Sequence, residues 1–287
     1  MPTLSFFKCS PGGNPTLLLP AAGLSPCQQE YVANTLLNPL HLYAEQVGFI
    51  DLHTPSLRMA GGEFCVNATR SLGALLALHG LLRPRPNATD GMLYGTACIS
   101  GLDSPIRLEV QPPQQPEQRC LQSAALVPLP NSVCCQPLEP GINLVVLPGI
   151  AHILIDASQH PLSAQWQADA ARLRQRFALE HHDAVGCIWW EKQGEAVRMR
   201  PIVWVRALHS ACYESSCGSG AMACALLLHR LQSPPLPEKD ARYTLWQPSG
   251  TALCVSYLPH TSCMRIDGPV TLVAEGTVYI EGPLPQA

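Results

Sequence analysis

The chain has 287 residues and a formal net charge of −3, with 18 Lys and Arg against 21 Asp and Glu. This length is enough for a large core and predicts two domains of ordinary size. The basic residues are scattered, so the sequence lacks the basic stripe that nucleic acid or an anionic membrane surface requires. We therefore expect a small-molecule partner, with no nucleic acid and no membrane.

The N-terminus lacks the charged segment and long apolar stretch of a secretory signal, and no later segment supplies about 18 uninterrupted apolar residues. Thirteen cysteines are an odd number in a chain too long to need disulfide staples. Together these features predict a soluble cytoplasmic protein with reduced thiols.

Hydrophobic periodicity and turn residues predict two halves separated by a proline-rich segment at 111–130. The first half is expected to contain strands at 16–19, 47–52 and 106–110, a helix at 28–37 and a helix after Cys65. The second half is expected to contain strands at 143–147, 152–155, 185–190 and 202–207, a helix at 164–179 and a helix after Cys217. Late strands are expected at 243–246, 251–257, 264–266, 271–274 and 277–281.

Cys65 and Cys217 share a local design that the other cysteines lack. Each follows an acidic residue, Glu63 or Glu214, and precedes an apolar helical run. The positive end of a helix dipole favours a thiolate, so both thiols are expected to ionise more readily than an ordinary cysteine. A single cysteine beside a helix is more often a small buried hydrophobe. The repeated context, about half the chain apart, favours a pair of acid/base groups.

Removing the α-proton of an amino acid and returning it to the opposite face needs one basic group on each side of the α-carbon. Two cysteines supply both groups when one is a thiolate and the other a thiol, because their ordinary pKa is about 8.5. Backbone N–H groups at a helix N-terminus can also hold the substrate carboxylate, and Gly218, Ser219 and Gly220 allow that close approach. This chemistry needs no cofactor, and none is expected.

Other polar residues are candidates for substrate binding. Glu45 and Glu214 can hold the substrate ammonium group, although an ordinary exposed carboxylate is an equally good interpretation of Glu45. Asn14 and Asn67 carry the paired donors and acceptors that suit a zwitterion, yet turns also favour asparagine. His152 lies in an apolar run and is most simply a buried, hydrogen-bonded histidine.

The residues leave two other classes open. Residues 218–223 match a dinucleotide fingerprint with alanine at the last position, which alone is weak evidence for a nicotinamide-dependent oxidoreductase. Ten histidines and thirteen cysteines would suit a metal-sequestering protein. However, the sequence has no C-x-x-C pair, no H-E-x-x-H and no zinc-type spacing, so no metal site is expected.

Local motifs along the chain resemble the diaminopimelate epimerase superfamily of cofactor-independent, two-cysteine racemases and epimerases. Residues 7–14 look like its N-terminal strand and substrate-binding asparagine, Asn14. The segments Cys65-Val66-Asn67-Ala68-Thr69-Arg70 and Cys217-Gly218-Ser219-Gly220-Ala221 are similar to its two cysteine motifs. The resemblance implies an α+β fold of two pseudo-symmetric halves, each a curved mixed or antiparallel sheet wrapped around a central helix.

Within this superfamily, five segments resemble the histidine racemases that supply D-histidine to staphylopine-type opine metallophores: 13–16, 45–50, 62–65, 214–217 and 247–250. Two departures from the superfamily pattern are visible. Val66 replaces the glycine that usually follows the first cysteine, and its branched side chain resists unusual backbone angles. Diaminopimelate epimerases carry a Glu-Arg-Gly run before the second cysteine, whereas residues 206–210 are Arg-Ala-Leu-His-Ser, which argues against a diacid substrate.

We therefore predict a pyridoxal-phosphate-independent racemase that interconverts L- and D-histidine, with diaminopimelate and hydroxyproline epimerases as alternatives of the same fold. Cys65 and Cys217 are the predicted acid/base pair. Substrate binding is assigned to Asn14, Glu45, Gln46, Asn67, Glu214, Gly218 and Ser219, with Glu63 and His152 supporting the catalytic pair. The predicted domains are residues 1–125, joined by a returning C-terminal strand at 276–287, and residues 126–275, with the active site in the cleft between them. A homodimer is the default expectation for a soluble enzyme.

Overall fold

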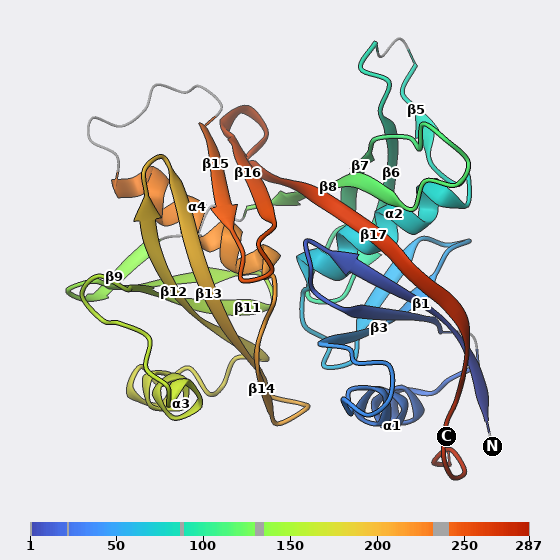
Figure 1. Cartoon of the computed structure of the whole chain (residues 1–287), viewed down its shortest axis with the longest axis horizontal. Coiled ribbons are helices and arrows are strands. Elements are labelled where there is room, and N and C mark those ends of the chain that lie inside the picture. The colour runs from blue at the N-terminus through green and yellow to red at the C-terminus, as the bar shows by residue number, and fades with distance from the viewer. Residues whose placement is uncertain (1, 22, 87–88, 130–134, 232–240, 287) are drawn as a thin grey trace. The chain divides into compact units, whose positions relative to one another are not determined.

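The computed structural model describes residues 2–21, 23–86, 89–129, 135–231 and 241–286 (Figure 1). The chain divides into two compact units, residues 1–125 with 268–287, and residues 126–267. The fold is mixed α/β, with many strands and few helices. Within the described ranges, no helix is long and apolar enough to cross a membrane.

The first unit builds a closed sheet. Its strands are β1 (Thr3–Pro11), β2 (Thr16–Pro20), β3 (Gln46–Asp51), β4 (Ser56–Met59), β5 (Arg83–Pro84), β6 (Leu93–Ile99), β7 (Ile106–Val110), β8 (Cys120–Pro128) and β17 (Cys263–Tyr279). β1 is antiparallel to β2 and β17. β2 is parallel to β3, which is antiparallel to β4. β4 is parallel to β6, and β6 is antiparallel to β5 and β7. β17 also pairs with β8, and Gln111 N donates to Gln122 O next to β7. These links close the strands into a barrel.

Helix α2 (Val66–Leu78) fills this barrel. All of its residues from Val66 to Ala77 are buried, and it packs against β1, β2, β3, β4, β6 and β7. An enclosed helix buries its apolar side chains on all sides, and Leu72, Leu75 and Leu76 are fully buried here, while the first turns also bury hydrogen-bonded polar residues such as Asn67 and Arg70. The strands therefore fix the position of the residue that precedes the helix, which is Cys65.

A second helix, α1 (Pro26–Leu36), joins β2 to β3 and covers their outer face. Parallel neighbours need such a crossover connection. Its apolar residues pack with those of the two strands in one core cluster, which includes Leu17, Leu19, Val32, Leu36 and Phe49. The helix begins with a capping box, in which Ser25 Oγ accepts from Gln28 N and Gln28 Oε1 accepts from Ser25 N.

The second unit is built from β9 (Cys135–Glu139), β10 (Ile142–Leu147), β11 (Ile150–Asp156), β12 (Ala184–Gln193), β13 (Ala196–Val205), β14 (Ser210–Tyr213), β15 (Ala241–Trp246) and β16 (Ala252–Leu258). β10 is antiparallel to β9 and β11, β11 is parallel to β12, and β12 is antiparallel to β13. β13 is antiparallel to β14 and parallel to β15, β15 is antiparallel to β16, and β16 is antiparallel to the first residues of β17. A short 3₁₀ turn, Pro259–Thr261, joins the last two strands.

Two helices cover opposite faces of the sheet formed by β11 and β12 (Figure 1). α3 (Trp166–Arg176) packs on one face over a core that includes Ile153, Ile155, Cys187 and Trp189. α4 (Gly218–Leu231) lies on the other face, in contact with β9, β10, β11, β12, β15 and β16. Its first eight residues, Gly218 to Ala225, are all buried. Cys217 therefore stands at the entrance to a buried helix, as Cys65 does.

The structure corrects several details of the predicted elements. The three late segments at 264–266, 271–274 and 277–281 are parts of one continuous strand, β17. The proline-rich segment at 111–130 contains β8, because its prolines flank the strand instead of interrupting it. The two units divide after Ala125, the predicted position, which lies within β8, and the C-terminal part of the first unit begins at Gly268.

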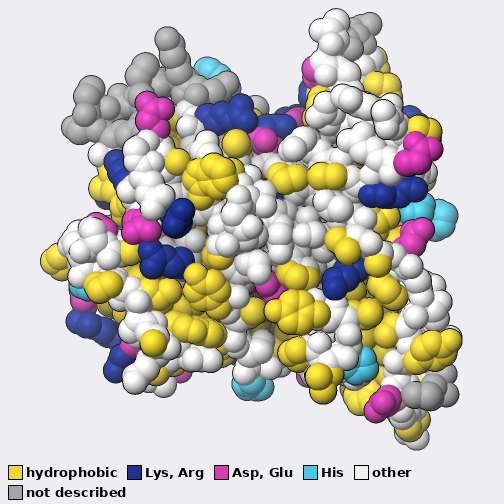
Figure 2. All heavy atoms as spheres, in the orientation of Figure 1, with side chains coloured by type: hydrophobic (Ala, Val, Ile, Leu, Met, Phe, Trp, Pro, Cys, Tyr) yellow, Lys and Arg dark blue, Asp and Glu magenta, His cyan; other side chains and the backbone are white. Residues whose placement is uncertain are grey.

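Charged side chains are spread over the face drawn in Figure 2, where Lys and Arg occur in small separate groups. The ion pairs of the described residues include Arg200 with Glu191 and Arg206 with Asp183. Exposed pairs of this kind contribute little to stability. The face shown has no continuous basic stripe of the kind that a polyanion would need.

Two glycines close to the start of α2 offer a matched test of the packing there. Gly62 and Gly101 have nearly the same positive φ, 76° and 77°. A Cβ at Gly62 would meet no atom within 4 Å, whereas one at Gly101 would lie 2.7 Å from Phe64 N. We expect Gly62→Ala to lower the free energy of unfolding by about 1 kcal/mol through backbone strain. Gly101→Ala should lower it by about 2–4 kcal/mol, because the Phe64 backbone must also move.

Urea unfolding of the two variants measures this difference. Equal losses for Gly62→Ala and Gly101→Ala would contradict the close packing of Gly101 on Phe64.

Candidate functional site

Cys65 is the N-cap residue of α2. Its backbone is extended, with φ −124° and ψ 109°, and its Sγ accepts a hydrogen bond from Ala68 N at 3.4 Å. The thiol also lies 3.1 Å from Gln46 Oε1, to which it donates. A sulfur in this position replaces the oxygen of an ordinary N-cap side chain. The helix N-terminus and one amide side chain therefore fix the Cys65 thiol.

Val66 occupies the first position of α2 without distortion. It is buried, and it is not one of the described non-glycine residues with positive φ. The helix start needs only ordinary helical angles, which a branched residue adopts readily. The replacement of the usual glycine therefore does not change the backbone at the first cysteine.

The first unit links Cys65 to Asn14 through a short chain of polar side chains. Asn14, fully buried between β1 and β2, donates from Nδ2 to Glu45 Oε2 at 2.8 Å. Thr16 Oγ1 lies 2.8 Å from Asn14 Oδ1 and 3.4 Å from Gln46 Oε1, the atom that faces Cys65. The parallel register of β2 and β3 pairs Thr16 with Gln46 and so creates this contact. We call Asn14, Thr16, Glu45, Gln46, Cys65 and Asn67 the Cys65 cluster.

Asn67 belongs to the first turn of α2 and is almost fully buried. Its Oδ1 accepts from Arg70 Nη1 at 3.4 Å. No role was expected for Arg70 or Thr16 from the sequence. An arginine that opens an otherwise apolar helical run, directly after a cysteine motif, was a signal that could have identified Arg70.

Cys217 directly precedes α4 and is only 3% exposed. Its backbone N donates to Gln247 Oε1 at 2.9 Å, and Gln247 Nε2 donates to Leu245 O at 3.1 Å. From the sequence, Gln247 belonged to the family-like segment 247–250 and had no predicted role of its own. We call Glu214, Cys217, Gly218, Ser219 and Gln247 the Cys217 cluster.

The protonation of Cys217 differs from the expectation that its helix would favour the thiolate. Burial raises the pKa of the Cys217 thiol well above its usual value, and the nearby Glu214 carboxylate, which accepts a hydrogen bond from the thiol, raises it further. Gly220 N–H and Ser219 act in the opposite direction but contribute less. Ser219 Oγ lies 3.7 Å from the sulfur. The expectation of easier ionisation is therefore wrong for Cys217, which carries its proton at neutral pH.

The glycine-rich run at 218–223 has a packing explanation. A Cβ at Gly220 would lie 2.8 Å from Ile188 Cδ1, 3.1 Å from Met199 Cε and 3.3 Å from Cys217 Sγ. Glycine is needed here so that α4 can approach β12 and β13. Close packing therefore explains the glycine at this position, and the match to a dinucleotide fingerprint needs no pyrophosphate-binding role.

Glu63 and His152 are both buried, in different units. Glu63 is 8% exposed, and its backbone O accepts from Ser100 Oγ at 2.8 Å. His152 on β11 lies beside Gly186 of β12, where an added Cβ would be 2.3 Å from the ring Nδ1. Neither ring nitrogen has a hydrogen-bond partner among the residues that the structure describes, so the expectation of a hydrogen-bonded histidine is wrong there. Burial lowers the pKa of His152 to about 3, which keeps the ring neutral.

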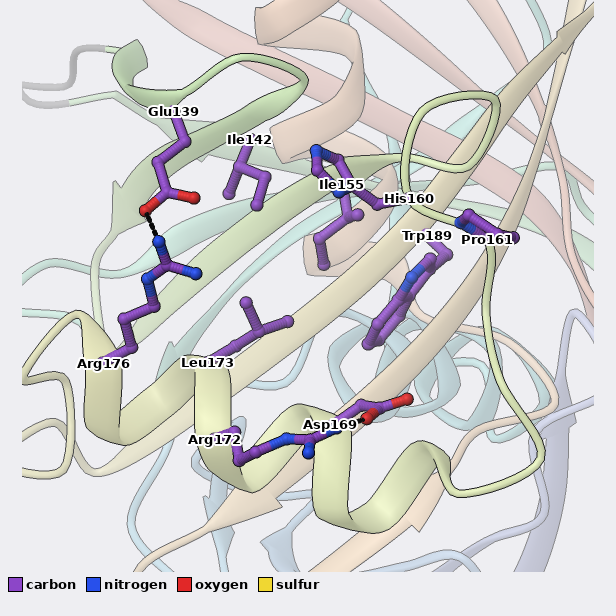
Figure 3. A pocket seen from close by; sticks show the side chains of 10 residues that line it. All are labelled: Glu139, Ile142, Ile155, His160, Pro161, Asp169, Arg172, Leu173, Arg176 and Trp189. Atoms are coloured by element: carbon purple, nitrogen blue, oxygen red, sulfur yellow. Dashed lines mark hydrogen bonds and ion pairs between the residues drawn. The ribbon is translucent and has the colours of Figure 1, made fainter.

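A cavity of about 380 Å³ lies between α3 and the sheet of the second unit (Figure 3). Its floor is apolar and includes Ile155 and Trp189, while its rim carries two ion pairs, Arg176 with Glu139 and Arg172 with Asp169. None of the predicted site residues lines this cavity. Among the described residues, no group of three or more His, Cys, Asp or Glu could hold a metal ion.

Comparison with known proteins gives consistent matches along the chain. A family model described as the histidine racemase CntK N-terminal domain matches residues 3–279. A histidine racemase of Fusobacterium nucleatum subsp. nucleatum is 29% identical over 280 residues, covering 96% of this chain and 97% of the relative. A histidine racemase of Staphylococcus aureus is 26% identical over 292 residues, covering 97% and 98%. The structure of a hydroxyproline epimerase from Agrobacterium vitis, with bound trans-4-hydroxy-L-proline, has a TM-score of 0.67, 11% identity and coverage of 98% and 94%.

The raised pKa of Cys217 leads to a prediction for Glu214→Gln. Removing the carboxylate charge removes one cause of the raised value, so the pKa of Cys217 should fall. The pH dependence of iodoacetamide modification, followed by mass spectrometry of the Cys217 peptide, should therefore move to lower pH. Cys187 is an internal control, because burial raises its pKa to about 12 and Glu214 is not among the causes.

Glu191→Gln is the matched control variant, since it removes a carboxylate of the same unit that is paired with Arg200. An unchanged Cys217 profile in Glu214→Gln would contradict the interaction between Glu214 and the thiol.

Proposed function

The chain belongs to the histidine racemase family, and we propose that it interconverts L- and D-histidine without a cofactor, with Cys65 and Cys217 as its two acid/base groups. Racemases are isomerases, and the family places this enzyme in that class. The observation that carries the proposed mechanism is the position of two cysteines, each at the N-terminus of a buried helix. The cofactor-free chemistry follows from this pair, since two thiols can complete the proton transfer alone.

We propose that the two units are pseudo-symmetric halves. When the short strands β5 and β14 are left out, the order β1, β2, α1, β3, β4, α2, β6, β7 in the first unit corresponds to β10, β11, α3, β12, β13, α4, β15, β16 in the second. In each series the second and third strands are parallel, and the fourth strand is parallel to the fifth, which is β6 or β15. This correspondence supports equivalent positions for Cys65 and Cys217. Two-base chemistry then requires both thiols to reach the same substrate molecule.

In the proposed reaction, the Cys65 thiolate removes the α-proton from one enantiomer. The electron pair of the broken C–H bond remains on the substrate as an enolate-like carbanion, which helix N-terminal N–H groups stabilise. The Cys217 thiol then donates its proton to the opposite face, which forms the new C–H bond and leaves a Cys217 thiolate. The reverse direction uses the same steps with the thiols exchanged.

The surroundings of Cys217 suit this role. Its thiol is protonated at neutral pH, as a proton donor must be. Once the proton has been given away, the thiolate is buried beside the Glu214 carboxylate, which makes it strongly basic. Cys217 therefore takes a proton back readily, either from solvent or from the other enantiomer of the substrate.

The residues that we propose for substrate binding are Asn14, Glu45, Gln46, Asn67, Glu214, Gly218 and Ser219, with Glu63 and His152 as supporting residues. Asn14 and Glu45 form one hydrogen-bonded pair that combines amide and carboxylate groups. Such a pair can accept from a substrate ammonium group. The backbone N–H groups of Gly218 and Ser219 lie at the start of α4, where a carboxylate binds favourably.

The choice of histidine over a diacid rests on the family and on the sequence before Cys217. Diaminopimelate epimerases carry a Glu-Arg-Gly run there, and residues 206–210 of this chain do not contain it. We therefore propose a substrate without a second carboxylate.

We also propose a cytoplasmic location, where the thiols of this cysteine-rich chain would stay reduced. The proposed product, D-histidine, is a building block for an opine-type metallophore in the pathway that the sequence resemblance implies. A homodimer remains a prediction for the oligomeric state.

Proton NMR in deuterium oxide tests the proposed function directly. The reduced, cofactor-free protein should replace the α-proton of L-histidine by deuterium while D-histidine accumulates. Cys65→Ser and Cys217→Ser should each lower racemisation at least about a thousandfold, because serine is a far weaker acid and its alkoxide is not formed at neutral pH.

The control variants are Cys98→Ser, at an exposed position, and Cys263→Ser, at a half-buried one. Both should keep activity within about twofold of the wild type. Full activity in either Cys65→Ser or Cys217→Ser would refute the two-base mechanism. Exchange with meso-diaminopimelate or trans-4-hydroxy-L-proline, but not with histidine, would refute the substrate.

A further inference from the structure

Arg70 is a fully buried arginine within the barrel of the first unit. It lies on α2, one turn beyond Asn67, and its guanidinium points to three separate acceptors. Nε donates to Ser123 O at 3.0 Å, Nη2 donates to Pro269 O at 3.0 Å, and Nη1 donates to Asn67 Oδ1 at 3.4 Å. These acceptors belong to β8, β17 and α2, so one side chain joins three segments that are distant in the sequence.

The contact with Pro269 extends to the turn that holds Asn14. Pro269 O also accepts from Gly12 N at 2.9 Å. Gly12 and Gly13 both have positive φ, 64° and 97°, and form the tight turn between β1 and Asn14. The position of Asn14 therefore depends on a carbonyl group that the Arg70 guanidinium also binds.

The contact with Asn67 fixes the orientation of its amide. A guanidinium carries only donors, so the Asn67 atom that faces it must be the acceptor Oδ1. The Nδ2 group then points away from Arg70. A substrate-binding asparagine needs such a fixed orientation, since a flipped amide would exchange its donor and acceptor.

Packing alone does not account for an arginine at this position. The buried face of α2 is otherwise formed by small and aliphatic side chains such as Leu72 and Leu75. Burial of a guanidinium is costly unless its hydrogen bonds are satisfied, and an unbranched apolar residue would fill the same volume without that cost. The planar fork of arginine, however, reaches several acceptors in fixed directions, which a lysine ammonium cannot do.

We infer that Arg70 is a positioning residue of the racemase, which orients the Asn67 amide and anchors the Gly12–Asn14 turn of the Cys65 cluster. This inference rests on the proposed function for its kinetic consequence, because Asn14 and Asn67 bind substrate in that proposal. Arg70 does not itself touch the reacting atoms. Its effect on catalysis is transmitted through the two asparagines.

A double-mutant cycle separates this role from a general structural one. Arg70→Lys should raise KM for L-histidine about tenfold while kcat falls less than about threefold, because the misplaced Asn67 weakens substrate binding. In the Asn67→Ala background, the same substitution should lower kcat/KM by a clearly smaller factor, since one of the two asparagines through which Arg70 acts is gone. Equal losses of kcat/KM in the two backgrounds would overturn the inference.

A second measurement does not depend on activity. In ¹⁵N-labelled protein, the side-chain signal of Asn67 and the backbone signal of Gly12 should shift in Arg70→Lys. Ser123→Ala is the matched control, because Ser123 Oγ donates to the backbone O of Arg70 at 2.8 Å without touching the guanidinium. In this control both signals should stay in place and KM should remain unchanged.

The two readouts distinguish the possible failures. If the wild type neither racemises nor exchanges histidine but the signals shift in Arg70→Lys, the proposed function fails and the anchoring by Arg70 stands. Unshifted signals in a folded Arg70→Lys protein overturn the positioning role, even when the wild type is an active racemase.

Discussion

Burial of α2 and α4 is the constraint on which the rest of the structure depends. Most side chains of a helix that is surrounded by strands are occupied by packing. Its N-terminus is different, since the first N–H groups have no partner within the helix and attract negative charge. In both units the residue at this end is a cysteine. The packing of each unit thus determines where its thiol lies and which backbone donors lie beside it.

The two thiols have similar positions along their helices, and each has a side-chain hydrogen-bond acceptor. The Cys65 thiol donates to the Gln46 amide oxygen, and the Cys217 thiol donates to the Glu214 carboxylate, which adds to the effect of burial in raising the pKa of Cys217. The Glu214 carboxylate therefore stabilises the protonated form of Cys217.

The sequence was informative where a local signal and the tertiary structure agree. The helices after Cys65 and Cys217 begin where expected, because the apolar runs that follow are long and continuous. The single strand β17 was divided into three segments, since Gly268-Pro269 resembles a turn and the exposed residues 273–277 lack the alternation of a half-buried strand. Burial is also why the titration of Cys217 was misjudged, because the helix dipole can be inferred from local sequence, whereas desolvation and the approach of Glu214 depend on the fold. Thr16 and Gln247 were overlooked for a related reason, since Thr16 contacts Gln46 and Gln247 contacts Cys217, about 30 residues away in the sequence.

Burial of polar residues around the cysteines costs free energy of folding, and hydrogen bonds to the strands offset much of that cost. Asn14, Asn67 and Arg70 are nearly or fully buried, and an unsatisfied polar group in such a place costs about 1–3 kcal/mol. Ser123 of β8 and Pro269 of β17 provide carbonyl acceptors, and Arg70 donates to one from each strand. Rigid strands hold these carbonyls in place, so the arginine is fixed in turn and can fix Asn67. The closed sheet therefore both encloses α2 and supplies the fixed acceptors that set the geometry at its N-terminus.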